Sequence, residues 1–425
     1  MACVEGDLHT PASGIFDTHV TWDDIEHDMQ KALKTQATIG PNKTVRNIGD
    51  GNGFLSRICL IEADWQNVQE GENLPKRFIA KLCTAVTMVQ VSEKMSEEKG
   101  LPNFINDEML VVMEKQVRTF HNNEVHVYHL MDKYKLDKVP RAKVYYARKF
   151  TEENPLKGFL LMEFVEDLSQ VHIFNVVKPE SLHQALRAIA AFEALTSRLT
   201  EDEKKSFTTK PLTEIFGTFF SDHIFDSMGQ FLRGFGGERL RDLIEELIII
   251  MPDFKDTLYV DAMPDHLHME RVLCHGDLWS TNILWRNSNG ETTIAAMIDF
   301  QTAHLGNPAG DLSRLFCTNL SGAERLAHSD ELLETFYAYL KEELGDLPAP
   351  YTLEQLKEAY KRYTPSAGYM VVPMLGSLFE MHLNNMNEKE KVDATEVLEE
   401  KMEFLIREVL EMHERNKKIR KEQNL

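Results

Sequence analysis

The chain has 425 residues, of which 43% are hydrophobic and 27% charged, with 22 glycines and 15 prolines. This composition is that of a globular protein and excludes collagen-like, low-complexity and largely disordered chains. The net charge of −21 argues against nucleic acid as a partner, because the protein would repel a phosphate backbone. Five widely spaced cysteines without a C-x-x-C pair indicate neither a disulfide framework nor a zinc ribbon. With no secretory signal and no run of ~20 apolar residues, we expect a cytoplasmic protein without a membrane span.

Residues 1–165 combine short β-rich runs with one long helical stretch. The expected elements, in chain order, are strands over 54–61 and 77–83, a helix over 106–134, and strands over 143–147 and 158–165. Two strands, a helix and two further strands predict a small mixed β/α lobe.

Residues 166–425 are mainly helical by their apolar spacing, with one compact β region. The expected elements are helices over 182–199, 212–232 and 239–251, strands over 271–274, 282–285 and 293–298, and helices from 311 to the end. The turn 287–290 contains Asn and Gly, which tolerate positive φ and favour a hairpin. The whole chain is therefore predicted to be α+β, with the larger, mainly helical lobe following the small one.

The most informative segment is Cys274-His-Gly-Asp-Leu-Trp-Ser-Thr-Asn282, which lies between two predicted strands. The next hairpin leads to Asp299, so Asp277, Asn282 and Asp299 are expected on loops at one edge of a small sheet. Two carboxylates and an amide carbonyl form an oxygen-only ligand set of the kind that Mg²⁺ prefers. One carboxylate can then hold metal while the other accepts a proton.

Other interpretations of these residues are less specific. Loop aspartates are commonly caps, which is the simplest interpretation of each one taken alone. A zinc site could be assembled from His266, His268, Cys274 and His275, although the first two lie in an expected loop. The sequence argues against a serine hydrolase, because the chain has no Gly-x-Ser-x-Gly nucleophile motif.

The pattern His275-x-Asp277-x-x-x-x-Asn282, followed by a strand and Asp299-Phe-Gln, resembles the phosphotransferase motif of protein kinases, aminoglycoside phosphotransferases and choline kinases. Its particular form is most similar to the choline-kinase-like (CHK) branch, which includes the ecdysteroid-kinase-like proteins. The resemblance implies a bilobed protein-kinase-like fold, with residues 1–165 as the nucleotide-binding lobe and 166–425 as the catalytic, acceptor-binding lobe.

The same resemblance assigns nucleotide contacts to residues 1–165. Lys81 matches the strand lysine that contacts the α- and β-phosphates, and Glu124 the helix glutamate that pairs with it; Glu114 is a competing choice. The glycine-rich turn, with Gly49, Gly51 and Gly53, could bind phosphates through backbone N–H groups, although it departs from G-x-G-x-x-G. A plain hairpin is its alternative. The connection between the lobes, including Glu163 and Val165, would offer backbone groups to adenine.

Two further residues of the motif region are expected to support the site without reacting. In the family, His275 orders the catalytic loop, so we expect a partly buried, hydrogen-bonded imidazole that is neither acid nor base. Asp311, in Gly306-Asn-Pro-Ala-Gly-Asp, is expected to be a helix N-cap and a support for that loop.

The reaction implied is ATP- and Mg²⁺-dependent transfer of the γ-phosphoryl group to a small-molecule alcohol, with Asp277 as catalytic base and with Asn282 and Asp299 as metal ligands. The acceptor could be a quaternary ammonium held by Trp279 and the tyrosines of residues 360–369, or a lipophilic, sterol-like alcohol, which we favour. Those aromatic residues also fit a helix core. Two alternatives are a weakly active pseudokinase, because Gln301 replaces the Gly of Asp-Phe-Gly, and a purely structural interaction protein. The sequence does not specify protein partners.

Overall fold

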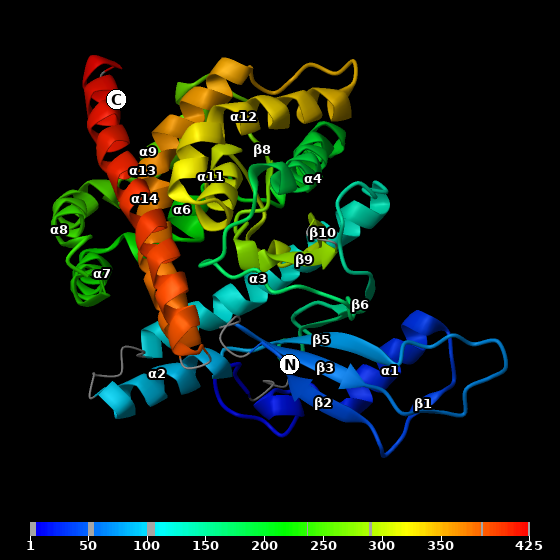
Figure 1. The fold of residues 1–425 in the computed structure, drawn as a ribbon. Helices are drawn as coiled ribbons and strands as arrows, with labels where there is room; N and C mark the ends of the chain where they lie inside the picture. Colours follow the sequence, from blue (N-terminus) through cyan, green and yellow to red (C-terminus); the bar gives the residue numbers. More distant parts are fainter. Residues whose placement is uncertain are drawn as a thin grey trace. The chain divides into compact units, whose positions relative to one another are not determined.

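The computed structural model describes residues 6–49, 55–99, 107–235, 237–288, 291–383 and 386–423. The chain divides into two compact units (Figure 1). Unit 1 comprises residues 1–133 and 141–167, and unit 2 comprises 134–140 and 168–425. The short segment 134–140 therefore groups with the helical part of the chain, although it precedes two strands of unit 1.

Unit 1 is built on a five-stranded sheet with the order β2-β3-β5-β7-β6, and every strand pair in it is antiparallel. Its helices and strands are α1 (Trp22–Leu33), β1 (Thr38–Ile39), β2 (Thr44–Asn47), β3 (Ser56–Glu62), β4 (Trp65–Gln66), β5 (Arg77–Cys83), α2 (Val86–Lys99), α3 (Asp107–Lys133), β6 (Val144–Arg148) and β7 (Phe159–Glu163). Strand β5 occupies the centre of this sheet.

The alternation of side chains along β5 places two kinds of residue on opposite faces. Phe78 and Ala80 belong to a core cluster that includes Ile25 and Met29 of α1. Lys81 points to the other face, where its ammonium meets Glu124 of α3. The strand pattern therefore directs a lysine away from the apolar core and toward a long helix.

Unit 2 is mainly helical and has two short two-stranded sheets. Its elements are α4 (His183–Ala194), α5 (Glu201–Lys205), α6 (Pro211–Glu214), α7 (Asp222–Phe235), α8 (Arg241–Ile250), α9 (Thr257–Asp261), α10 (Met263–His266), β8 (Val272–Cys274), β9 (Ile283–Ser288), β10 (Glu291–Met297), β11 (His304–Gly306), α11 (Ala309–Asn319), α12 (Gly322–Leu344), α13 (Leu353–His382) and α14 (Glu388–Gln423), with short 3₁₀ turns between them. A core cluster of this unit contains Leu232, Ile244, Leu247, Val371, Leu375, Leu398 and Ile406, which come from α7, α8, α13 and α14.

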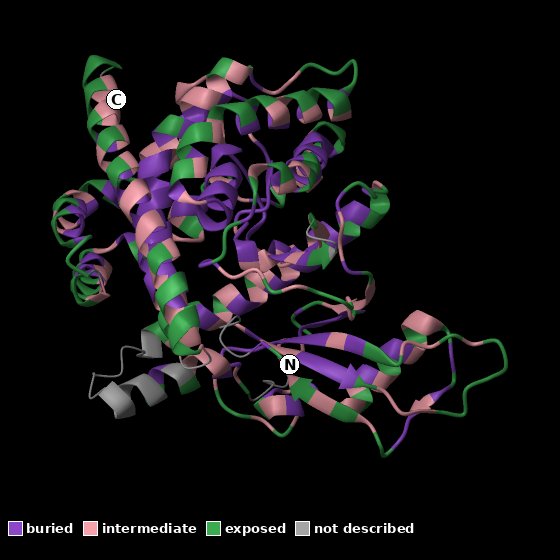
Figure 2. Ribbon diagram, in the orientation of Figure 1, coloured by how far each residue is buried: buried purple, intermediate pink, exposed green. Residues whose placement is uncertain are grey.

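Helix α11 lies at the centre of unit 2, and Figure 2 shows it buried along nearly its whole length. Lys401 of α14 reaches its carboxyl end and donates to the backbone carbonyls of Thr318, Ile173 and Asn175 at 2.9, 2.8 and 2.7 Å. The ammonium is almost fully buried, and burial lowers the pKa of Lys401 to about 7. This side chain fastens the last helix to the helix that carries Asp311 and Arg314.

The predicted α+β class, with a strand-containing amino-terminal part and a mainly helical remainder, is confirmed. The single helix predicted over 212–232 is wrong, because the chain turns through a 3₁₀ segment at Gly217–Phe220 and is extended at Ser221 before α7 begins. Helix α1 and strand β11 are elements that the sequence pattern did not reveal. Within the described residues, no helix is both long and apolar enough to cross a membrane.

Candidate active site

The motif from His275 to Asn282 lies in the loop that follows β8 in unit 2. Strand β8 pairs antiparallel with β11, so that Cys274 lies opposite His304, and the hairpin of β9 and β10 connects the two strands. The loop therefore starts beside the point where the segment after Asp299 returns to the sheet. This topology brings Asp277, Asn282 and Asp299 to one region of the unit, as the sequence predicts.

Asp311 holds the first turn of this loop. Its two carboxylate oxygens accept from the backbone N–H groups of His275 at 2.6 Å and Gly276 at 2.8 Å. Gly276 has φ +88°, and a Cβ atom there would lie 2.3 Å from the carbonyl oxygen of Thr302, so only glycine fits. The predicted support of the loop by Asp311 is confirmed, but its predicted N-cap role is wrong, because Pro308 occupies the N-cap position.

His275 is fully buried and bonded through both ring nitrogens. Nδ1 accepts from the N–H of Asp277 at 3.3 Å, which leaves the proton on Nε2 to be donated to the carbonyl of Ile298 at 3.0 Å. The imidazole thus ties the loop to the segment leading into Asp299. The predicted hydrogen bonding of this histidine is present, and the ring is buried more completely than the sequence predicts.

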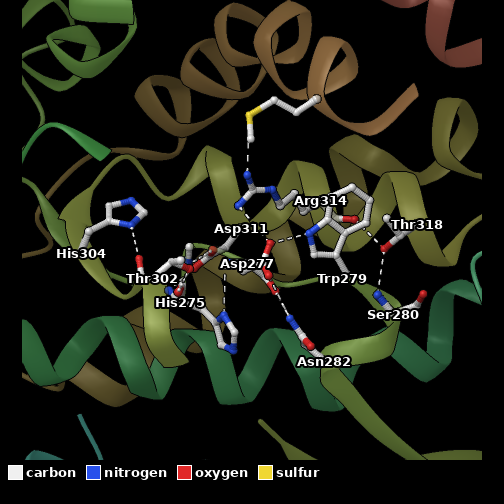
Figure 3. Close-up of polar contacts among 12 residues, drawn as sticks. His275, Asp277, Trp279, Ser280, Asn282, Thr302, His304, Asp311, Arg314 and Thr318 are labelled. Carbon is white, nitrogen blue, oxygen red and sulfur yellow. Dashed lines mark hydrogen bonds and ion pairs between the residues drawn. The ribbon is translucent and has the colours of Figure 1, made fainter. Parts of the chain in front are cut away.

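Asp277 lies in a partly buried polar cluster, with a quarter of its side chain exposed (Figure 3). Its Oδ1 accepts from Nε1 of Trp279 at 2.5 Å, and its Oδ2 accepts from Nδ2 of Asn282 at 3.2 Å. Burial and the nearby charge of Asp299 raise the pKa of Asp277 above its usual 3.8, while the Arg314 guanidinium opposes the shift. A carboxylate with a raised pKa is better matched to accepting a proton than an ordinary one.

Asn282 is fixed by hydrogen bonds of its side chain and backbone, and Asp299 lies near enough for its charge to act on Asp277. The Asn282 amide donates to the carbonyl of Asp277 at 2.7 Å, and its own carbonyl accepts from the N–H of Ile298 at 3.0 Å. Because Nδ2 of Asn282 donates to Asp277, the side-chain oxygen Oδ1 of Asn282 points away from Asp277. Asp299 has a left-handed backbone, with φ +69° and ψ +54°, an uncommon conformation for a non-glycine residue and one that recurs at functional sites.

Arg314 of α11 is a member of the cluster that the sequence analysis missed. Its Nη1 lies 3.9 Å from Oδ1 of Asp277, and the guanidinium carbon lies 4.8 Å from the Phe216 ring and 6.0 Å from the Trp279 ring (Figure 3). The side chain is only 4% exposed. Its position one turn after Asp311, on the same helix, was the available signal, because residues three apart lie near one another on a helix.

In unit 1, Lys81 and Glu124 form a buried ion pair with an Nζ–Oε2 distance of 2.6 Å. Glu114, the competing choice, is engaged elsewhere. Its carboxylate accepts from the N–H of Leu8, contacts Nδ1 of His9 and pairs with Arg118 at 3.0 Å. The structure therefore brings Lys81 together with Glu124 and not with Glu114.

Replacing the two glutamates separately distinguishes these pairs. We expect Glu124→Gln to lower the free energy of unfolding by about 3 kcal/mol, because it removes the charge that balances a buried ammonium. The matched control, Glu114→Gln, should cost less than ~1 kcal/mol, because that carboxylate is more exposed and an amide oxygen can still accept from Leu8. Urea denaturation of both variants measures the difference, and equal losses would contradict it.

Of the remaining predicted nucleotide contacts, Gly49, Glu163 and Val165 lie at or just beyond the ends of strands of unit 1. Gly49 follows β2, is buried, and donates its N–H to Oδ1 of Asn47 at 3.1 Å. Gly51 and Gly53 lie outside the described residues. Glu163 is the last residue of β7 and donates its N–H to the Lys143 carbonyl at 2.8 Å, and Val165 lies two residues beyond, partly buried.

The alternative assignments find little support in the geometry. Tyr369 packs against Phe220, Phe225 and Phe254, and the other two tyrosines of the proposed cage are dispersed: Tyr360 contacts Phe316, and Tyr363 lines a small pocket beside Asn307. These residues form core, as the simpler interpretation held. The four possible zinc ligands do not converge; in the described part of the chain the one metal-type grouping is Asp7, His9 and Glu114.

The antiparallel sheet of unit 1, the mainly helical unit 2 and the loop cluster around Asp277 match the organisation expected for a protein-kinase-like fold. A family model described as "DUF1679: Uncharacterized oxidoreductase dhs-27" matches residues 8–417, and the chain belongs to this family.

Curated relatives include the "uncharacterized kinase-like protein D1044.1" of Caenorhabditis elegans, which is 36% identical over 99 residues, covering 23% of this chain and 25% of that protein. The "uncharacterized oxidoreductase dhs-27" of the same organism is 21% identical over 330 residues, covering 73% of this chain and 37% of that protein. Viomycin phosphotransferase of Streptomyces vinaceus is 30% identical over 61 residues, covering 14% of this chain and 20% of that enzyme. The matches thus span between a fifth and two fifths of the relatives' lengths. Kinase-like and phosphotransferase relatives confirm the family resemblance predicted from the motif.

Similar solved structures include choline kinase from Cryptosporidium parvum, with a TM-score of 0.46 and 10% identity over 90% of this chain and 91% of that one. Plasmodium vivax ethanolamine kinase gives a TM-score of 0.43 and 13% identity over 91% of this chain and 86% of that one.

Proposed function

We propose that this chain transfers the γ-phosphoryl group of ATP to a hydroxyl of a small molecule, with Mg²⁺. The observation that carries the proposal is the cluster of Asp277, Asn282 and Asp299, in which one carboxylate has a raised pKa and lies among fixed donors. A protein that moves phosphoryl groups needs mainly positioning and charge neutralisation, because the transition state is loose.

In this reaction a bond forms between the acceptor oxygen and the γ-phosphorus while the bond to the bridging β,γ-oxygen breaks, and ADP leaves. Asp277 accepts the proton that the acceptor hydroxyl loses. Asn282 and Asp299 supply an amide and a carboxylate oxygen, a donor set that fits Mg²⁺. When bound, the metal neutralises phosphate charge.

In the same proposal, unit 1 supplies the nucleotide contacts. Lys81, oriented by Glu124, neutralises the α- and β-phosphates, and the turn containing Gly49, Gly51 and Gly53 offers backbone N–H groups. Backbone atoms near Glu163 and Val165 contact adenine. We further propose that the protein works in the cytoplasm and that its partner is a small-molecule alcohol rather than nucleic acid.

The family description invites an oxidoreductase as the competing function. Dinucleotide-binding folds of the doubly wound type need a mostly parallel sheet with a glycine-rich turn at a helix start. All strand pairs in the described residues are antiparallel. The relative that carries the name matches this chain over 37% of its length, so most of the named protein lies outside the match. Binding of NADH or NADPH with equal or greater effect than ATP would favour the competing function.

Thermal unfolding with ATP, with Mg²⁺ and with both tests the proposal. We expect the two together to stabilise the wild type by about 2–3 kcal/mol at a hundredfold excess over the dissociation constant. Asp299→Asn should lose most of this gain, while Asp202→Asn, at a side chain that is 96% exposed, should keep it. A wild type unmoved by ATP and Mg²⁺ would exclude the kinase and leave the interaction protein. Stabilisation without transfer to any alcohol would favour the pseudokinase.

A further inference from the structure

Arg314 is a buried cation whose hydrogen-bonding capacity is largely unused. A guanidinium has five N–H donors. Within the described residues, Arg314 donates one hydrogen bond, from Nη2 to the thioether sulfur of Met370 at 3.6 Å, and this sulfur is a weak acceptor. The contact to Asp277 is 3.9 Å, too long for a hydrogen bond.

The buried arginine Arg325 provides a contrast within the same unit. It is 3% exposed and forms a close ion pair with Glu408, which satisfies its charge directly. Arg314 is 4% exposed, yet its nearest described carboxylate stands at 3.9 Å. Arg325 thus directs its charge to one carboxylate, whereas most N–H donors of Arg314 have no acceptor among the described protein residues and are available to a ligand.

The direction of the side chain indicates where that partner would lie. In Figure 3, Arg314 extends from α11 toward Asp277 and Trp279. Its guanidinium occupies the aromatic faces of Phe216 and Trp279, at 4.8 and 6.0 Å. Those faces are where a ligand ammonium would bind by a cation–π interaction, and the protein's own cation already covers them.

We propose that Arg314 determines acceptor specificity by binding an anionic oxygen group of the acceptor, such as a carboxylate, close to the hydroxyl that Asp277 deprotonates. This inference rests on the proposed function. The planar guanidinium fits two carboxylate oxygens at once. The preferred acceptor is thus an acidic alcohol, a neutral alcohol is second, and an amino alcohol is the poorest.

Electrostatics gives the expected size of the preference. A cationic group on an acceptor bonded to Asp277 stands within roughly 6 Å of the guanidinium, and like charges at that separation repel enough to change affinity by about tenfold to a hundredfold. An acceptor with an anionic group in the same place binds more tightly by a similar factor. The repulsive half of this effect matters for specificity as much as the attractive half.

The test compares ω-hydroxy carboxylates, α,ω-diols and ω-amino alcohols of matched chain length. For each we would measure ADP release as kcat/KM and, separately, the rise in Tm in the presence of Mg²⁺ and ADP. For the wild type we expect the order carboxylate, diol, amine in both measurements. Arg314→Glu should reverse the order, and Arg314→Lys should keep it with a smaller difference. Arg407→Glu is the control, because Arg407 is 61% exposed and lies on α14.

A wild type that prefers amines, or an order unchanged in Arg314→Glu, would overturn the inference. If Arg314→Glu does not fold, Arg314→Lys and Arg314→Met still test the inference. Both variants should reduce the preference for hydroxy carboxylates over amino alcohols. If no acceptor stabilises or reacts with the wild type, the inference fails. If ATP and Mg²⁺ still raise Tm, the nucleotide-binding part of the proposed function stands and only the acceptor inference fails; if they leave Tm unchanged as well, the proposed function fails with it.

Discussion

Asp277→Asn is expected to reduce kcat by about a thousandfold without unfolding the protein. Removing a positioned general base typically costs 10²–10⁴-fold, and an amide cannot accept the hydroxyl proton. The substitution keeps the shape of the side chain and one oxygen for Trp279 or Asn282. ADP release measured on a responsive acceptor gives the loss, and a variant that retains full turnover would refute the role of Asp277.

Because the pKa of Asp277 is raised, the melting temperature of Asp277→Asn shows whether the ionised carboxylate destabilises the folded protein. Between 3.8 and the raised value the folded state binds more protons than the unfolded state, so the free energy of unfolding falls as pH rises through this window. At pH 7 the ionised Asp277 therefore costs stability, and Asp277→Asn should melt at or above the wild-type temperature. Wild-type kcat should decline as pH falls, with a midpoint above 3.8. Asp277→Asn melting well below the wild type would contradict this account.

Asp311→Asn should be the most destabilising of the conservative substitutions in the motif region. Both carboxylate oxygens accept buried N–H groups, from His275 and Gly276, and an amide presents one of them with an NH₂ group instead. We expect a loss of about 2–4 kcal/mol in the free energy of unfolding, together with a large loss of activity as the loop is released.

Urea denaturation measures the stability effect of Asp311→Asn. Asp330→Asn, at an exposed aspartate of α12, is the matched control and should change stability by less than ~0.5 kcal/mol. If the two variants unfold at the same urea concentration, the two hydrogen bonds of Asp311 do not support the loop in solution.

The parts of the fold that the sequence predicted are those with a strong local pattern. Strand β5 matches the predicted range of 77–83, and α3 lies within one residue of the predicted helix at either end. The motif around Asp277 was recognisable because its residues lie on one short loop and one hairpin. These features depend on neighbours in the sequence, which a pattern can register.

Other parts depend on contacts between distant segments. Strand β11 has three residues and is a strand because it pairs with β8, some 30 positions earlier. Arg314 belongs to the cluster because α11 is buried beside the loop, and its spacing of three residues from Asp311 indicates this only once Asp311 is known to contact the loop. Asp311 binds N–H groups 35 and 36 residues away, which a cap prediction based on helix starts could not anticipate.

The three carbonyls that converge on Lys401 restrict which side chains and modifications position 401 tolerates. A tetrahedral ammonium can donate to all three, whereas methionine fills the space and leaves the carbonyls without their donor, and acetylation removes the charge and two of the three protons. One of these carbonyls belongs to Thr318, at the carboxyl end of α11, the helix that bears Asp311 and Arg314. The support of the loop by α11 therefore depends on the chain as far as residue 401. Removing residues from the carboxyl end up to and including Lys401 would therefore remove the donor at this end of α11 before any residue of the motif is lost.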